Sequence, residues 1–434
     1  MPKTELKEVI GCKKKFHVEV EPERVERELT TTFRKVRAEL QIPGFRKGKA
    51  PESMIWKRFG KAVREEALGD MLPKILQEVF DEKNINPIGQ PEIRDLNYEE
   101  GSPLSFTVSV EEIPDIDISG FEGLKVTKKI FTVTDEDVDK SLESLRLMHA
   151  KRNPVDREVR QGDIIVVNLQ KLDSSGVPLI GEKIENHVLE LDGESTPSPE
   201  FDRQVYGMKK DESKTVRFTY DESINNSDLV GTSEAYSVKI VQVIEKLVPE
   251  LNDAFAQSLG EYESLADLYE KTREDLIWRV GFIAGQKLKA DLINEFVKTY
   301  PFEVPNTMVD RIIQSELEKA RASKKNQSFD EEAFRQEIRP EAVRSVQTFI
   351  IIDAVKEDKQ IAVTREEMMV RIQKMADSSG MDVKEVRRTL IKDGRYDSIK
   401  EELTREKAYD WMIETADVTV ETGPSRPRES SLIT

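Results

Sequence analysis

The sequence predicts a multidomain α+β protein with an N-terminal α+β domain, an antiparallel β domain and a large all-α C-terminal domain. Three observations support this prediction. The chain has 434 residues, enough for about three domains of ~100–200 residues each. Strand patterns rich in Val and Ile are concentrated in residues 157–246. After Pro249, apolar residues recur at spacings of three and four, which is the period of amphipathic helices.

The N-terminal domain, residues 1–113, begins with a strand and a helix. Residues 13–20 end in alternating apolar and polar side chains, the period of a half-buried strand. Pro22 suits the first turn of the helix, and Pro43 ends it. One face of this helix carries five apolar residues: Val25, Leu29, Phe33, Val36 and Leu40.

The remainder of this domain is predicted to be helical and then extended. A short helix over residues 51–59 precedes a longer helix with a broad apolar face. Pro73 lies inside the longer helix and predicts a kink or a break near Gly69–Asp70. Strands near residues 91–97 and 104–113 complete the domain.

Residues 114–150 are predicted to be a connector, with an extended segment and then a helix that Thr134 caps. Residues 151–246 form the β domain, with four strand patterns and one short helix at 201–208.

Residues 247–421 form the predicted helical domain. It contains five apolar helical patterns, of which the last runs from Leu403 to Ile413. The Pro- and Ser-rich tail, residues 422–434, is predicted to be disordered.

Composition excludes several classes of protein. The net charge of -17 argues against a general nucleic-acid binder, and no apolar run is long enough to span a membrane. The single cysteine, Cys12, excludes an internal disulfide, and the first fifteen residues lack the apolar segment of a signal peptide. We therefore expect a cytoplasmic protein. The three histidines are scattered, so neither a metal nor a cofactor is expected.

Residues 42–51, IPGFRKGKAP, form a loop that presents Phe45 among cations. The flanking residues 34–64 carry ten cations and only two anions, although the whole chain is acidic. A phosphate-binding loop is rejected, because one residue is missing between the glycines and Ala50 replaces the hydroxyl. Two interpretations stay open. The loop is either an ordinary solvated turn or a docking surface that joins an apolar anchor to phosphate-binding cations.

The motif GFRKGKAP between two helices resembles the ribosome-binding loop of the bacterial trigger factor family. VREEALGDML and the segment that begins PELNDAF also resemble that family, and the resemblance covers essentially the full length. It implies a chaperone that docks beside the ribosomal exit tunnel, at a large-subunit protein and ribosomal RNA. The implied contacts are Phe45, Arg46 and Lys47, in a loop shaped by Gly44, Gly48 and Lys49.

The resemblance also implies that the β domain is an inserted FKBP-like peptidyl-prolyl isomerase, in which pocket aromatics stabilise a twisted amide. The corresponding positions keep two aromatics, Phe201 and Tyr236. Leu169, in NLQK where the family has D-F-x-G, and Ile224 replace the other two, and Glu200 replaces a glycine. We therefore expect weak or absent proline isomerisation.

The family's chaperone cradle corresponds to the connector and the helices after residue 247, which would hold nascent polypeptides for folding or export. The cradle contains a Met-rich stretch with Met368, Met369, Met375 and Met381. Two interpretations of these methionines stay open, client binding and ordinary helix packing. The leading hypothesis is an ATP-independent, ribosome-associated chaperone, and relatives imply a weak homodimer off the ribosome. The alternative is a free holdase or foldase with an isomerase domain, and an RNA-binding translation factor is disfavoured by the acidic remainder of the chain.

Overall fold

The computed structural model describes residues 2–42, 45–99, 101–192, 196, 198–220, 231–323 and 330–423. The chain divides into two compact units. One contains residues 1–128 and 285–421, and the other contains residues 129–284 and 422–434.

The N-terminal part of the first unit is a four-stranded antiparallel sheet with the strand order β1-β2-β4-β3. Residues that pair across its two central strands, such as Val18 and Phe106, are fully buried on one face. The strands are β1 (Lys3–Ile10), β2 (Lys13–Val20), β3 (Ile88–Asn97) and β4 (Leu104–Glu111). The first of them was not predicted, because it is an exposed edge strand without apolar alternation.

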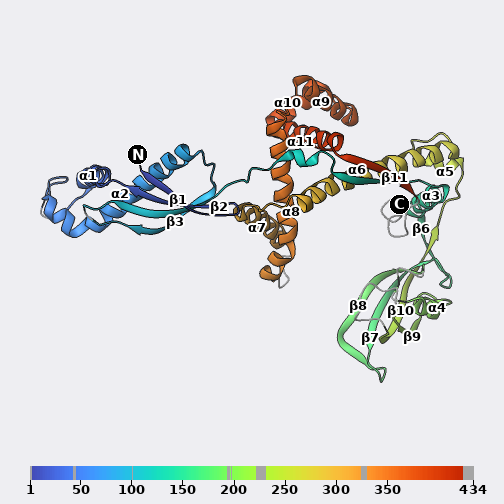
Figure 1. Ribbon diagram of the computed structural model, residues 1–434. Helices are drawn as coiled ribbons and strands as arrows, with labels where there is room; N and C mark the ends of the chain where they lie inside the picture. The colour runs from blue at the N-terminus through green and yellow to red at the C-terminus, as the bar shows by residue number, and fades with distance from the viewer. Residues whose placement is uncertain are drawn as a thin grey trace. The chain divides into compact units, whose positions relative to one another are not determined.

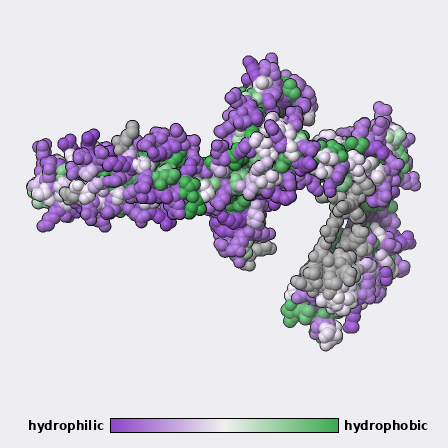
Figure 2. Space-filling view, viewed as in Figure 1, coloured by the Kyte–Doolittle hydropathy of each residue, from purple (hydrophilic) through white to green (hydrophobic). Residues whose placement is uncertain are grey.

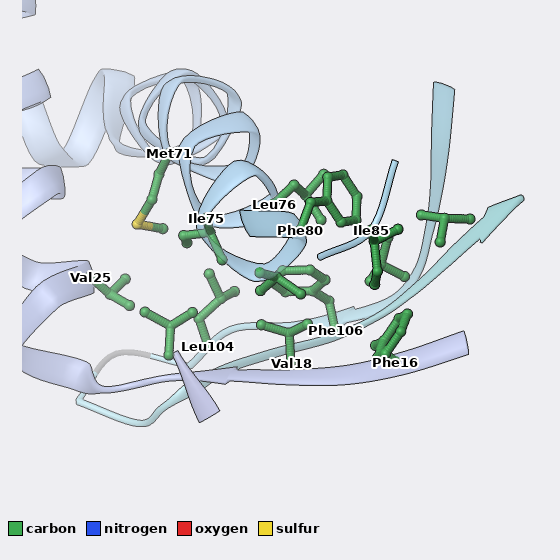
Figure 3. Packing of buried hydrophobic residues seen from close by; sticks show 14 of the residues in the cluster. Phe16, Val18, Val25, Met71, Ile75, Leu76, Phe80, Ile85, Leu104 and Phe106 are labelled. Atoms are coloured by element: carbon green, nitrogen blue, oxygen red, sulfur yellow. The ribbon is translucent and has the colours of Figure 1, made fainter. Parts of the chain in front are cut away.

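Two helices, α1 (Pro22–Glu39) and α2 (Glu52–Lys83), accompany this sheet. Figure 3 shows Met71, Ile75 and Phe80 of α2 pointing toward Val18 and Phe106 of the strands, with which they share one core. The prediction of two separate helices here was wrong. A single helix of 32 residues runs through Pro73 without a break, since the apolar positions on both sides of the proline are buried in a continuous row.

The rest of the first unit is mainly helical (Figure 1). Phe121 of the short 3-10 helix η1 (Ile118–Phe121) stacks on Phe296, with 4.3 Å between ring centroids, in a core that also holds Ile351 and Met412. The helices are α6 (Leu265–Thr299), whose second half belongs to this unit, α7 (Asn306–Ser323), α8 (Glu331–Asp358), α9 (Arg365–Ser379), α10 (Val383–Lys392) and α11 (Arg395–Thr415).

The predicted helical character of the C-terminal region is confirmed, with two further elements that were not predicted. The short helix α10 is one. The other is a closing strand, β11 (Asp417–Gly423), which pairs with β5 (Lys125–Phe131). Thr422 and Gly423, assigned to the tail by the sequence, therefore lie in a strand, and residues 424–434 lie outside the described residues.

The second unit contains α3 (Asp135–Met148), α5 (Asp253–Ser258) and the first half of α6. The predicted cap is confirmed, since Thr134 and Asp137 form a reciprocal capping box at the start of α3. Val138 and Leu142 of α3 are fully buried against Phe255 and Leu268.

The β domain of the second unit is a five-stranded antiparallel sheet in the order β6-β10-β7-β8, with β9 also paired to β10. A short helix, α4 (Pro199–Val205), supplies Phe201 to its core. The strands are β6 (Lys151–Val155), β7 (Ile164–Leu172), β8 (Pro178–Glu190), β9 (Ser213–Thr219) and β10 (Ser233–Leu247). Strand β6 and the first half of β8 were not predicted, because both are largely exposed.

Candidate functional site

The basic loop between α1 and α2 is held at both ends by buried side chains. Ile42 and Ala50 are 4% and 5% exposed, and they pack in a small cluster with Phe33 and Ile55. Arg37 in the last turn of α1 forms an ion pair with Glu52, the first residue of α2. These contacts fix the two ends of the loop relative to each other.

Between these anchors the backbone turns tightly. The amide of Phe45 donates to the carbonyl of Ile42 at 3.0 Å, and the amide of Lys49 donates to Arg46 at 2.9 Å. Gly48 adopts a φ of +74°, and its amide donates to the carbonyl of Leu40 at 3.4 Å. Gly44, predicted to shape the loop, lies outside the described residues.

The side chains of this loop point to solvent. Phe45 is 38% exposed, and Arg46, Lys47 and Lys49 are exposed. Within the described part of the chain none of these three cations forms an ion pair, whereas Lys35 pairs with Asp70 at 3.6 Å. An exposed aromatic ring is therefore presented beside three cations that are available to an external anion.

The β domain contains an aromatic cluster built around the buried ring of Phe218. Phe201 meets it edge-on at 5.7 Å between ring centroids, Tyr220 edge-on at 5.1 Å, and Tyr236 is stacked on it at 6.0 Å. Phe201 and Tyr236 were predicted as pocket residues, whereas Phe218 and Tyr220 were not. A signal existed, because both lie in the strand pattern KTVRFTY, two residues apart and therefore on one face.

A carboxylate lies beside this cluster. Glu234 accepts hydrogen bonds from the hydroxyls of Tyr236 at 2.7 Å and Tyr220 at 2.9 Å, both on Oε2, and its Oε1 pairs with Lys171 at 2.5 Å. Burial and the hydrogen bond to this carboxylate raise the pKa of Tyr220 to about 12. Burial opposes ionisation of Glu234, but the hydrogen bonds from Lys171 and the tyrosines outweigh it and lower the pKa of this carboxyl.

The two pocket positions without an aromatic differ in what the structure describes. Leu169 is 7% exposed and pairs with Val238 in the core of the β domain, so an aliphatic side chain fills the position. Ile224 lies outside the described residues.

The Met-rich stretch is divided between core and surface. Met368 is buried and Met375 is partly buried, both in the cluster that joins α9, α10 and α11. Met369 and Met381 are exposed. Helix packing therefore accounts for Met368 and Met375, and only the two exposed methionines are available to a client.

A more exposed apolar surface lies on α6 and was missed from the sequence. Trp278 and Phe282, 69% and 52% exposed, stack at 5.5 Å between ring centroids, and Ile277, which precedes Trp278 in the sequence, is also exposed. Their spacing of four residues was a usable signal. We call Ile277, Trp278 and Phe282 the α6 aromatic patch. The face of the molecule in Figure 2 is mostly hydrophilic.

The described residues offer neither a metal site nor a membrane-spanning helix. No group of three or more His, Cys, Asp or Glu side chains there is placed to hold a metal ion. No helix there is long and apolar enough to cross a membrane.

Comparison with known proteins covers nearly the whole chain. Residues 1–145 match the family model "Bacterial trigger factor protein (TF)", and residues 264–414 match the model of its C-terminus. The trigger factor of Halothermothrix orenii is 31% identical over 418 residues, covering 93% of this chain and 97% of that protein. The trigger factor of Anoxybacillus flavithermus is 32% identical over 415 residues, covering 92% and 96%.

A solved structure gives the same likeness at the level of the fold. It comes from work on promiscuous substrate recognition in the folding and assembly activities of the trigger factor chaperone. The TM-score is 0.50 at 19% identity, covering 95% of this chain and 99% of that chain.

Proposed function

Because this chain belongs to the bacterial trigger factor family of chaperones, we propose that it docks on the large ribosomal subunit near the exit tunnel and holds nascent polypeptides. The single observation that carries the docking is the exposed Phe45 beside Arg46, Lys47 and Lys49 on a loop with buried ends. An apolar ring supplies a specific docking point, and cations supply affinity for ribosomal RNA by releasing counterions.

Cosedimentation with 70S ribosomes tests this proposal. The variant F45A/R46A/K47A should lose most of its pelleting at moderate salt, since it removes the ring and two of the three loop cations. A matched control, F349A/R388A/K392A, removes the same three residue types from exposed positions on α8 and α10. This control should pellet as the unchanged protein does.

Equal pelleting of both variants and the unchanged protein would defeat the docking proposal. If the protein then still suppressed aggregation of an unfolded client, the alternative of a free holdase would stand. The assay therefore separates the two candidate functions.

We further propose that the α6 aromatic patch contacts unfolded clients. Exposed, stacked rings offer a large apolar area that loses little conformational entropy on binding. The variant W278A/F282A should suppress the aggregation of a denatured client several-fold less well, as measured by light scattering. F349A/Y300A, which removes two exposed rings elsewhere, is the control, and an equal loss in both would contradict a specific role for the patch.

The family carries a peptidyl-prolyl isomerase domain, and we propose that its activity is weak in this chain. The aliphatic Leu169 in place of an aromatic ring supports this, because the apolar surface that would stabilise a twisted amide is smaller. A protease-coupled assay on a short Xaa-Pro peptide measures the activity. Turnover as high as that of an ordinary FKBP-type enzyme would contradict the proposal.

A further inference from the structure

On the face of the β domain sheet that packs into its core, two neighbouring strands, β7 and β10, each carry a charged side chain near one end. Side chains two residues apart on a strand share a face, so Glu234 and Tyr236 continue the row of the buried Val238. Lys171 pairs with Tyr236 across the ladder and lies on that same face. A carboxylate and an ammonium group therefore border the aromatic cluster, on the face that also carries the buried Leu169 and Val238.

Both charged groups are largely withdrawn from solvent. The side chain of Glu234 is 14% exposed and that of Lys171 is 28% exposed. Lys171 stands at the glycine of the family pattern D-F-x-G, so this sequence places a long cation where that pattern has no side chain. The pair thus occupies space beside the rings and makes it more polar.

The tyrosine hydroxyls of the cluster already donate their protons in hydrogen bonds within the domain. A tyrosine hydroxyl has one proton to donate. Tyr220 and Tyr236 both donate it to Oε2 of Glu234, at 2.9 Å and 2.7 Å. A peptide carbonyl that enters an apolar site loses its hydrogen bonds to water and binds poorly unless a donor replaces them.

We propose that Glu234, held by Lys171, suppresses prolyl-peptide binding in this domain by sequestering the hydroxyls of Tyr220 and Tyr236. Glu234 is a specificity-determining residue here, and its removal frees two donors and opens an apolar site. This inference rests on the proposed isomerase function of the domain, and it attributes the weak activity to an added ion pair as well as to missing aromatics.

The test is a gain of function in the full-length protein. K171A/E234A should raise kcat/KM on a short Xaa-Pro peptide about tenfold over the unchanged protein, the factor expected from one ordinary hydrogen bond. K171M/E234L replaces the ion pair by apolar side chains of similar volume and should raise kcat/KM as well. It takes the place of K171A/E234A in the test if that variant folds poorly. The control K246A/E190A removes another lysine–glutamate pair of the same sheet and should gain nothing.

Two further variants test the role of the hydroxyls. Y220F and Y236F, added to K171A/E234A, should abolish the gain, which a change in packing alone would leave in place. E234Q keeps an acceptor for both hydroxyls and should stay near the unchanged protein.

No gain in either the alanine pair or the apolar pair would overturn the inference, and so would a gain that survives loss of both hydroxyls. The kcat/KM of the unchanged protein tests whether its isomerase activity is weak. The ratio of kcat/KM between the variant and the unchanged protein tests this inference. The two can therefore fail separately.

Discussion

Gly48 closes the basic loop with a left-handed backbone conformation, at φ +74°. An added Cβ would meet Ala38 only at ordinary contact distances of 3.7 Å, so a substitution would be strained by its backbone and not by a clash. For an alanine this strain is about 1–2 kcal/mol. The left-handed conformation of Gly48 therefore contributes to the loop conformation that presents Phe45.

The variant G48A is expected to weaken ribosome binding about fivefold, because ~1 kcal/mol of strain lowers the population of the binding conformation by that factor. Cosedimentation titrations would measure it. G101A carries a comparable strain, at φ +83° in the turn between β3 and β4, and should leave the affinity unchanged. An equal loss in both variants would contradict the assignment of the loop.

Tyr220 gives a prediction about pH. Burial and the hydrogen bond to Glu234 raise its pKa to about 12, above the value of 10.0 for a free tyrosine. Because the folded pKa is raised, this contribution to stability is fully present below pH 10 and is lost as the pH rises through 12. The ultraviolet absorbance of the phenolate, as the difference between the unchanged protein and Y220F, should show titration near 12. Titration near 10 would contradict the buried, hydrogen-bonded hydroxyl.

Among the helices, α2 shows most directly how packing overrides a local signal. Pro73 lacks the amide that would bond the carbonyl of Gly69, a defect that costs about 3 kcal/mol inside an isolated helix. Met71, Ile75 and Val79 around it are buried against the sheet, and this burial keeps one helix continuous through Pro73. Pro73 itself is exposed, so its ring contributes little to the core.

P73A is therefore expected to stabilise α2 by about 1–3 kcal/mol, because it restores an amide donor without disturbing the core. Hydrogen exchange of peptides from residues 66–80 should slow accordingly. P91A is the control, since Pro91 lies in the edge strand β3, where a missing donor costs less. Unchanged exchange in P73A would show that the helix already compensates for the missing bond.

The elements that the sequence predicted are those with one buried face. Helices such as α1 and α3, and strands such as β7, carry a period set by their own core. The missed strands β1, β6 and β11 are largely exposed, so no period marks them. Their strand conformation depends on partners elsewhere in the chain, which local patterns do not contain.

The candidate sites follow the same division. Phe45 and its cations could be singled out as candidates because they are contiguous in the sequence; the structure confirms that they are exposed, and their role in docking stays a prediction. Glu234 could not be related to Tyr220 without the register of β9 and β10, which places it opposite Phe218. Met368 was a candidate for client binding because sequence alone does not tell which side of a helix meets a neighbour.

For the whole molecule, the excess of positive charge is confined to one short segment, so the proposed attraction to the ribosome would be local. The first 112 residues carry a net charge of -1 and the remainder carries -16, so the excess of eight cations in residues 34–64 stands out in an acidic chain. Electrostatic docking and apolar client binding should then respond differently to salt.

Raising the salt concentration should weaken ribosome binding and leave client holding nearly unchanged. R46A/K47A should lower the slope of log affinity against log salt by about 1–2, since each phosphate contact releases roughly one counterion. Cosedimentation and light scattering across a salt series measure the two activities. If W278A/F282A changed the slope as much as R46A/K47A does, the separation of docking from holding would be wrong.

The pairing of β5 with β11 also affects how this protein is made. About 290 residues separate the two strands, so during synthesis at roughly 5–20 residues per second β5 waits about 15–60 s for its partner. For that time its edge is open to other extended chains. A protein proposed to shield unfinished polypeptides is therefore itself an unfinished polypeptide, with an open strand edge, until β11 is translated.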